Sequence, residues 1–211
     1  MLNVKSISPF IFLMAFIIVA SNYLVQFPVN YTISDYNLAD LLTWGAFTYP
    51  IAFLITDMTN RKFGTKSARI VVAVGFLIAV GLSIWLATPR IAIASGSAFL
   101  IAQLLDVSIF NSLRKSTWWH APLISSIIGS IIDTVLFFAI AFSAGFGFLG
   151  FEDTFVLENA PLLGLFAMEA PRWISWAMGD LGVKLIVGLV MLIPYGAALP
   201  YLTGGKTTAA A

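Results

Sequence analysis

The stretch RIVVAVGFLIAVGLSIWLA, residues 69–87, begins with one charged residue, Arg69, and is otherwise almost entirely apolar. A membrane-spanning β-strand would alternate apolar and polar residues over about 10 positions, and this stretch does not alternate. A helix needs about 20 mostly apolar residues to cross a bilayer, and it satisfies its own backbone hydrogen bonds in lipid. Residues 69–87 therefore predict a transmembrane helix.

The composition of the whole chain points the same way. Of its 211 residues, 60% are hydrophobic and 10% are charged, whereas soluble domains carry about 45–50% apolar and about 25% charged residues. This balance argues against a soluble enzyme or a nucleic-acid-binding protein, and a net charge of +1 gives no preference for polyanions. The chain has no cysteine and one histidine, His120, so we expect no disulfide, metal site or cofactor.

Six stretches are long and apolar enough to be transmembrane helices: about 9–27, 41–58, 68–87, 91–113, 122–148 and 172–200. The first has the apolar core of a signal peptide, but its apolar run continues through Phe27, so we expect a retained anchor. We predict an all-α integral membrane protein with one six-helix domain over residues 1–203 and a flexible cytoplasmic tail over 204–211.

The distribution of basic residues predicts the orientation. Cytoplasmic loops of membrane proteins carry an excess of Lys and Arg. Only Arg90 and Arg172 fall on one side of the predicted spans, and eight basic residues fall on the other: Lys5, Arg61, Lys62, Lys66, Arg69, Arg114, Lys115 and Lys206. Both termini are therefore expected in the cytoplasm, with loops 28–40 and 149–171 outside.

Five ionisable residues lie within or at the ends of the predicted spans: Asp57, Asp106, Asp133, Asp180 and Lys184. Each costs about 2.5–3.5 kcal/mol at a helix centre, so each should face protein or water and be paired, protonated or bound to a ligand. Asp180 and Lys184 are four residues apart and predict an ion pair on one helix face. The pair either neutralises itself or lines a substrate cavity beside Trp176.

Other polar residues suggest two further groupings. If the small-residue faces of the fourth and fifth spans meet, three polar residues would converge inside the bundle: Gln103, Asp106 and Asp133. This group would either hold the two helices together through hydrogen bonds or form a binding site. The second grouping is a structural clamp at the membrane surface, formed by Pro50, Asp57, Asn60, Arg61 and Arg69. In the clamp, Asp57 is close enough in sequence to pair with either arginine. Pro50 is also expected to kink its helix beside Tyr49.

The stretch TYPIAFLITDMTNRKFGTKSARIVVAVG, residues 48–75, resembles the hallmark of the queuosine precursor transporters, also called the vitamin uptake transporter (VUT) family. Its recognisable parts are Tyr49-Pro50, Thr56-Asp57, Asn60, Gly64, Ala68-Arg69 and Gly75. Weaker matches elsewhere are Asn22, Asp106, Ser130, Asp133-Thr134, Gly179-Asp180 and Lys184. The length and the number of spans also match, so the resemblance covers essentially the whole chain.

The resemblance implies import across the bacterial inner membrane of a 7-deazaguanine, 7-cyano-7-deazaguanine or its aminomethyl relative, for queuosine synthesis in tRNA. It also implies a bundle similar to the substrate-capture subunits of energy-coupling-factor vitamin importers. A guanine-like base needs an aromatic surface and a carboxylate for its N–H donors. We expect substrate contacts from Asn22, Trp44, Tyr49, Phe53, Gln103, Asp106, Asp133, Trp176, Asp180 and Lys184. Within this set, Asp133 or Asp106 would accept from the base and Lys184 would meet O6 or the cyano nitrogen.

Three alternatives stay open from the sequence. The chain could capture another vitamin for a separate ATP-driven module, act as an intramembrane aspartyl enzyme through Asp106 and Asp133, or be a structural membrane protein. No span contains a G-x-G-D or H-E-x-x-H motif, so we expect no enzyme. The expected partners are a nucleobase-like small molecule and the lipid bilayer, with no nucleic acid. A homo-oligomer and the driving force stay open.

Overall fold

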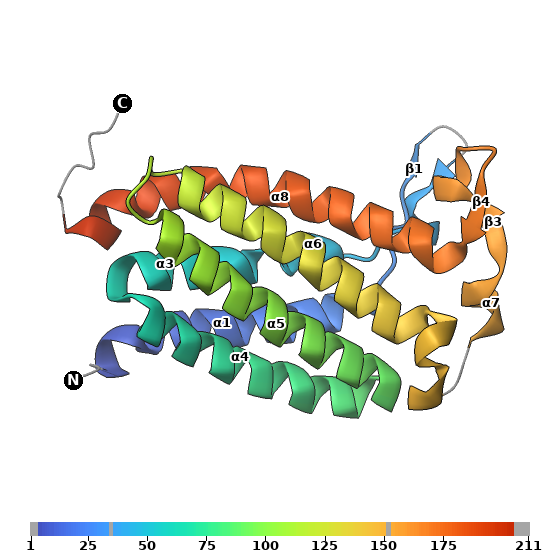
Figure 1. Ribbon diagram of the computed structural model, residues 1–211, viewed down its shortest axis with the longest axis horizontal. Helices are drawn as coiled ribbons and strands as arrows, with labels where there is room; N and C mark the ends of the chain where they lie inside the picture. Colours follow the sequence, from blue (N-terminus) through green and yellow to red (C-terminus); the bar gives the residue numbers. More distant parts are fainter. Residues whose placement is uncertain (1–3, 34–35, 151–152, 205–211) are drawn as a thin grey trace.

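The computed structural model describes residues 4–33, 36–150 and 153–204. Its long helices lie side by side in an elongated bundle, and the small strands lie at one end (Figure 1). The longer helices are α1 (Val4–Leu24), α3 (Ile51–Phe63), α4 (Thr65–Leu86), α5 (Pro89–Leu113), α6 (His120–Phe142) and α8 (Arg172–Thr203). The short helices are η1 (Leu38–Asp40), α2 (Gly45–Thr48), η2 (Ala144–Leu149), α7 (Thr154–Leu157) and η3 (Leu162–Gly164).

Two small antiparallel sheets lie at the same end of the bundle. Strand β1 (Thr32–Ile33) pairs with β2 (Tyr36–Asn37), and β3 (Asn159–Pro161) pairs with β4 (Glu169–Pro171). We call this the strand end. The start of α1 and the last turn of α8 lie together at the opposite end, which we call the terminal end (Figure 1). The predicted tail falls mostly on residues 205–211, outside the described residues, as do Asp35, Glu152 and Lys206.

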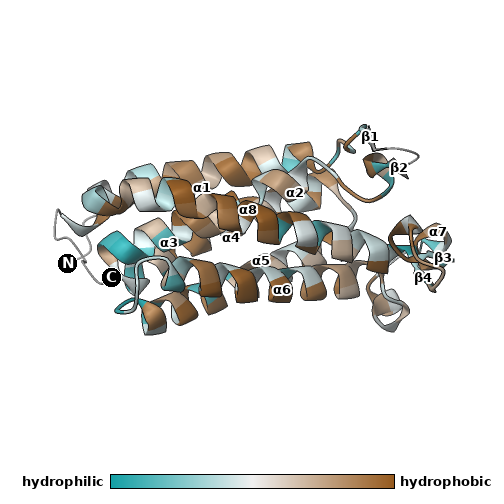
Figure 2. Ribbon diagram, turned by 90° about the horizontal axis from the view of Figure 1, so that it is seen from above, coloured by the Kyte–Doolittle hydropathy of each residue, from teal (hydrophilic) through white to brown (hydrophobic). Residues whose placement is uncertain are grey.

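Five helices in the described ranges are long and apolar enough to cross a membrane: α1, α4, α5, α6 and α8. They match five of the six predicted spans, so the protein is a multi-pass, all-helical membrane protein apart from its short strands. Figure 2 shows hydrophobic residues along the length of the bundle and a gathering of hydrophilic residues near the terminal end. The predicted span 122–148 is shorter than expected, since α6 ends at Phe142 and Ser143 is extended.

The predicted span 41–58 is not one continuous helix. It is divided into α2 and α3 at Tyr49 and Pro50. Pro50 has no backbone N–H, so it cannot donate to the carbonyl four residues earlier. The chain instead makes tighter turns there, with the Ala52 N–H donating to the Tyr49 carbonyl at 3.0 Å and the Phe53 N–H to the Pro50 carbonyl at 3.1 Å. The expected kink at Pro50 is thus a break between two helices.

Helix α3 occupies the centre of the bundle. It packs against α1, α4, α5, α6 and α8. Because these longer helices surround it, α3 can keep its polar side chains away from lipid: Thr56, Asp57, Thr59, Asn60 and Arg61 are all buried. This environment explains how a segment too polar for a lipid-facing helix is accommodated.

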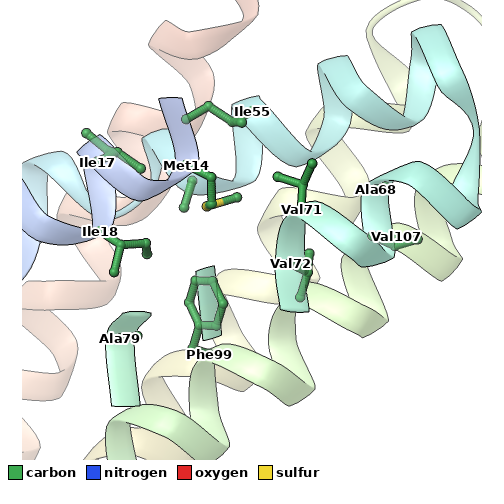
Figure 3. Packing of buried hydrophobic residues seen from close by; sticks show 11 residues of the cluster. Met14, Ile17, Ile18, Ile55, Ala68, Val71, Val72, Ala79, Phe99 and Val107 are labelled. Atoms are coloured by element: carbon green, nitrogen blue, oxygen red, sulfur yellow. The ribbon is translucent and has the colours of Figure 1, made fainter. Parts of the chain in front are cut away.

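An apolar cluster joins α1, α3, α4 and α5 on one side of the bundle (Figure 3). Met14, Val72 and Phe99 are each 0% exposed within it. Gly75 permits the close approach of these helices, because a Cβ at this position would lie 2.8 Å from Met14 Cγ and 3.1 Å from Phe99 Cζ. Three charged residues of α6 and α8 lie outside this cluster: Asp133, Asp180 and Lys184.

Candidate functional site

A cavity of about 820 Å³ lies in the strand-end half of the bundle. Its walls come from α1, α2, the ends of α4 and α5, α6 and α8, together with the segments around the small strands. Ligand pockets typically measure about 300–1,000 Å³, so a nucleobase-sized molecule fits. Six of the predicted site residues line the cavity: Asn22, Tyr49, Asp133, Trp176, Asp180 and Lys184.

Three charged residues line one part of the cavity: Asp133, Asp180 and Lys184. Thr134 joins them through hydrogen bonds, and we call these four residues the charged floor. Lys184 Nζ lies 2.7 Å from Asp133 Oδ2 and 2.5 Å from Asp180 Oδ2. It also donates to Thr134 Oγ1 at 3.2 Å, and that hydroxyl donates to Asp180 Oδ2 at 2.9 Å. The ion pair predicted from the spacing of Asp180 and Lys184 is therefore present, and it is joined by a second carboxylate from α6.

The charged floor leaves carboxylate oxygens available and no ammonium hydrogen. An ammonium has three donors, and Lys184 directs its three to Asp133, Asp180 and Thr134. Asp133 Oδ1 has one long contact, 3.5 Å from the Tyr49 hydroxyl. The Asp180 side chain is 17% exposed, against 5% for both Asp133 and Lys184. With all three groups ionised, two carboxylates and one ammonium give a net charge of −1, which suits a ligand edge rich in N–H donors.

Aromatic rings supply much of the remaining wall: Tyr49, Phe137, Phe138, Phe142, Phe155 and Trp176. Phe142 and Trp176 meet edge to face at 5.8 Å between ring centroids. The Tyr49 ring lies 5.5 Å from Lys184 Nζ, so it borders both the charged floor and the open space. Asn22 lines the α1 wall, where its Oδ1 lies 3.5 Å from Ser83 Oγ. The cavity thus combines flat apolar walls with a few polar groups, as small-molecule sites do.

Four predicted contact residues do not line the cavity: Trp44, Phe53, Gln103 and Asp106. Trp44 is 49% exposed and contacts Phe47. Phe53 is buried against Gly129, where a Cβ would come within 2.7 Å of its ring. Gln103 Oε1 accepts a hydrogen bond from Thr56 at 2.7 Å.

The expected convergence of Gln103, Asp106 and Asp133 is not observed. The structure has two separate acidic groups: the charged floor around Asp133, and a deeper pair in which the carboxyls of Asp57 and Asp106 lie beside each other. Shared helix faces can be derived from sequence spacing, but which neighbouring helix each face meets depends on the packing of the whole bundle.

The predicted clamp residues are arranged differently from the expected pairing. Asp57 does not pair with Arg61; its oxygens lie 3.4 Å from the hydroxyls of Ser125 and Ser126. Arg61 reaches across the bundle, donating to the Tyr195 hydroxyl at 2.7 Å and to the Arg114 carbonyl at 2.6 Å. The Arg114 side chain donates in return to the Arg61 carbonyl.

The other clamp residues have separate roles. Asn60 donates to the Val107 carbonyl at 3.0 Å and joins α3 to α5. Arg69 is exposed, and Pro50 lies at the break between α2 and α3. A network does close the terminal end, but its partners lie on α5 and α8, far from Arg61 in the sequence.

Several residues that line the cavity could not be predicted as site residues from the sequence: Ser21, Gln26, Asp40, Phe142, Phe155 and Arg172. Most lie at helix ends or in loops, where neither periodicity nor an unusual residue type marks a site. Arg172 is fixed by the Glu158 carboxylate at 3.7 Å and by the Phe155 ring at 4.3 Å. The sequence pointed to Thr134 only because it follows Asp133 in one of the weaker matches to the family.

These features define a class: a multi-pass helical membrane protein with a cavity large enough for a small molecule. The sequence matches the family described as "Putative vitamin uptake transporter" over residues 43–87 and 82–198. It is 34% identical to the "Probable queuosine precursor transporter" of Haemophilus influenzae, over 87% of this chain and 82% of that protein. It is also 34% identical to the "Queuosine precursor transporter" of Escherichia coli, over 88% of this chain and 83% of that protein.

The chain belongs to the vitamin uptake transporter family, as the motif in residues 48–75 predicts. A "Probable queuosine precursor transporter" of Bacillus subtilis is 27% identical over 47% of this chain and 56% of its own length. No solved structure matches the chain.

Proposed function

We propose that this protein imports a queuosine precursor, 7-cyano-7-deazaguanine or 7-aminomethyl-7-deazaguanine, across a bacterial inner membrane. The names of the relatives support this class of substrate. The cavity supports a small flat molecule, because its volume of about 820 Å³ and its aromatic walls suit one.

In this proposal the chain crosses the membrane six times. Helices α2 and α3 together make the sixth crossing, since the chain enters them at the strand end and leaves α3 at the terminal end (Figure 1). Six basic residues with described positions lie in the last turn of α3, in the first turns of α4 or directly after α5: Arg61, Lys62, Lys66, Arg69, Arg114 and Lys115. Positive charge favours the cytoplasm, so the terminal end faces inward and the cavity outward. The bundle would then resemble vitamin-capture subunits in its design.

The charged floor is the feature that most supports a deazaguanine base as the substrate. Lys184 fixes two carboxylates side by side and leaves an oxygen of each without a strong partner. N1–H and the 2-amino group of a deazaguanine are adjacent donors that match such acceptors. Hydrogen bonds to charged groups are worth about 1.5–3 kcal/mol. In the proposed site Asp180 and Asp133 accept the base edge, Tyr49 and Trp176 face the ring, and Asn22 contacts its far side.

Lys184 has a different role in this site from the one that the sequence suggested. It would have to give up a bond to Asp133, Asp180 or Thr134 in order to meet O6 or a cyano nitrogen. It therefore serves to hold the two carboxylates in place, while the substrate meets the carboxylates themselves.

Queuosine in tRNA provides the test. The host is a bacterium that lacks both precursor synthesis and its own transporter, supplied with a low concentration of precursor. Wild-type protein is expected to restore queuosine, and Asp180→Asn and Asp133→Asn to reduce it about tenfold or more through the lost charged hydrogen bond. Asp153→Asn is the matched control, because Asp153 caps α7 at an exposed position and Asn caps equally well. The control variant should keep normal queuosine. Normal queuosine in Asp180→Asn and Asp133→Asn as well would contradict the proposed site.

A further inference from the structure

A second acidic pair lies below the charged floor, toward the terminal end of the bundle. Asp57 on α3 is 1% exposed and Asp106 on α5 is 0% exposed. Their carboxyls lie beside each other. Among the described residues, neither oxygen of Asp106 has a hydrogen-bond partner, and the contacts of the Asp57 carboxylate with hydroxyl groups are those with Ser125 and Ser126 at 3.4 Å.

Within the part of the chain that the structure describes, the pair has no counter-ion. The ion pairs among residues 4–33, 36–150 and 153–204 involve Lys184 and Arg172, and none reaches Asp57 or Asp106. Two buried carboxylates side by side repel each other strongly, and such pairs hold a proton between them. The charge balance of this site therefore requires at least one proton, in contrast to the charged floor, where Lys184 supplies the positive charge.

The neighbouring helices place polar, charged and apolar groups around the acidic pair. Helix α6 contributes the hydroxyls of Ser125 and Ser126. Helix α8 contributes Lys184 and Tyr195, which line a small cavity that Asp57 also lines. Arg61 on α3 is directed to the Tyr195 hydroxyl, and α1 and α4 meet α3 through the apolar cluster of Figure 3.

This environment accommodates both protonation states. A serine hydroxyl can donate to a carboxylate or accept from a carboxylic acid, so Ser125 and Ser126 can serve either form of Asp57. The small cavity measures about 10 Å³, which is near the minimum for one water molecule. Its lining includes one member of each group, Asp57 of the acidic pair and Lys184 of the charged floor.

We infer that Asp57 and Asp106 form a proton-binding site that couples substrate import to the proton gradient. The inference rests on the proposed function, since it needs a transported substrate. The chain between the two sites is short: Tyr49, which contacts Asp133 in the charged floor, lies just before α3, and Asp57 lies about two turns further along, within α3. A change of charge at the pair thus acts on α3, which begins two residues after the cavity-lining Tyr49.

Purified protein in lipid vesicles tests the inference with labelled 7-cyano-7-deazaguanine. With an acidic exterior, wild-type protein should accumulate substrate, and a gradient of one pH unit supports about tenfold accumulation for one proton per substrate. Asp106→Asn and Asp57→Asn should abolish accumulation while keeping exchange of labelled for unlabelled substrate. Gradient-driven accumulation by both variants, or by wild-type protein with a sodium gradient alone, would overturn the inference.

A second measurement needs no variant. Addition of substrate to wild-type vesicles that contain a pH indicator should acidify the interior in step with uptake, and uptake without acidification would overturn the inference. The proposed function fails separately, if wild-type protein neither binds nor exchanges the precursor under any gradient. Binding in detergent by Asp106→Asn at wild-type strength would confirm that the variant is folded and that the substrate cavity is independent of the pair.

Discussion

At the scale of single residues, Lys184 is expected to have the largest effect on stability and on substrate binding. It is 4% exposed and is the positive partner of two carboxylates on different helices. Removing one member of a buried ion pair leaves an uncompensated charge and costs about 3–5 kcal/mol. The side chain therefore contributes to both stability and substrate binding, and the two effects can be separated.

Lys184→Met should lower the thermal stability of the detergent-purified protein and abolish uptake. The double variant Asp133→Asn with Lys184→Met removes one charge of each sign and should recover much of the stability but none of the uptake. Lys66→Met is the control, because Lys66 is exposed at the terminal end of the bundle. Thermal unfolding and queuosine content measure the two effects, and uptake by the double variant at the wild-type rate would contradict the role given to the charged floor.

At the scale of elements, the short helix α2 depends on its contact with the end of α1. A Cβ on Gly45 would lie 2.8 Å from Val25 Cβ and 2.9 Å from Val25 Cα. The obstacle includes backbone, which cannot rotate aside as the end of a long side chain can. Gly45 also lines the cavity, so displacement of α2 would change the site.

Gly45→Ala should therefore destabilise the protein by about 1–3 kcal/mol, the usual range for overpacking, and should weaken substrate binding. Gly81→Ala on α4 is the matched control, since nothing lies within 4 Å of a Cβ there and alanine is the better helix former. The melting temperatures of the two variants provide the comparison. Equal melting temperatures would show that α2 is not held against α1 in this way.

Features that depend on a single helix could be predicted from the sequence. The five long apolar helices and the Asp180–Lys184 pair follow from composition and spacing along one segment. Partners from distant helices could not be predicted. Arg61 was expected to pair with Asp57, but it donates a hydrogen bond to Tyr195, 134 residues away. Spacing identifies which residues share a face, but the neighbour of that face is decided by three-dimensional packing.

At the scale of the whole molecule, the account predicts that the strand end faces outside. The chain contains no cysteine, so single cysteines can be introduced into a clean background. Phe148 is 81% exposed in η2 near the strand end, and Ser116 is exposed between α5 and α6 near the terminal end. A membrane-impermeant thiol reagent should label Phe148→Cys in intact cells and Ser116→Cys only after permeabilisation. The reverse pattern would place the cavity on the cytoplasmic side.

The central claim is that the two carboxylates fixed by Lys184 hold the donor edge of a deazaguanine. The most direct measurement is equilibrium binding to purified protein of 7-cyano-7-deazaguanine and of the analogue that lacks the 2-amino group. The account predicts that wild-type protein binds the analogue about tenfold or more weakly, because a charged acceptor loses its donor. It also predicts that Asp180→Asn or Asp133→Asn narrows this difference. Equal binding of the two compounds to wild-type protein would contradict it.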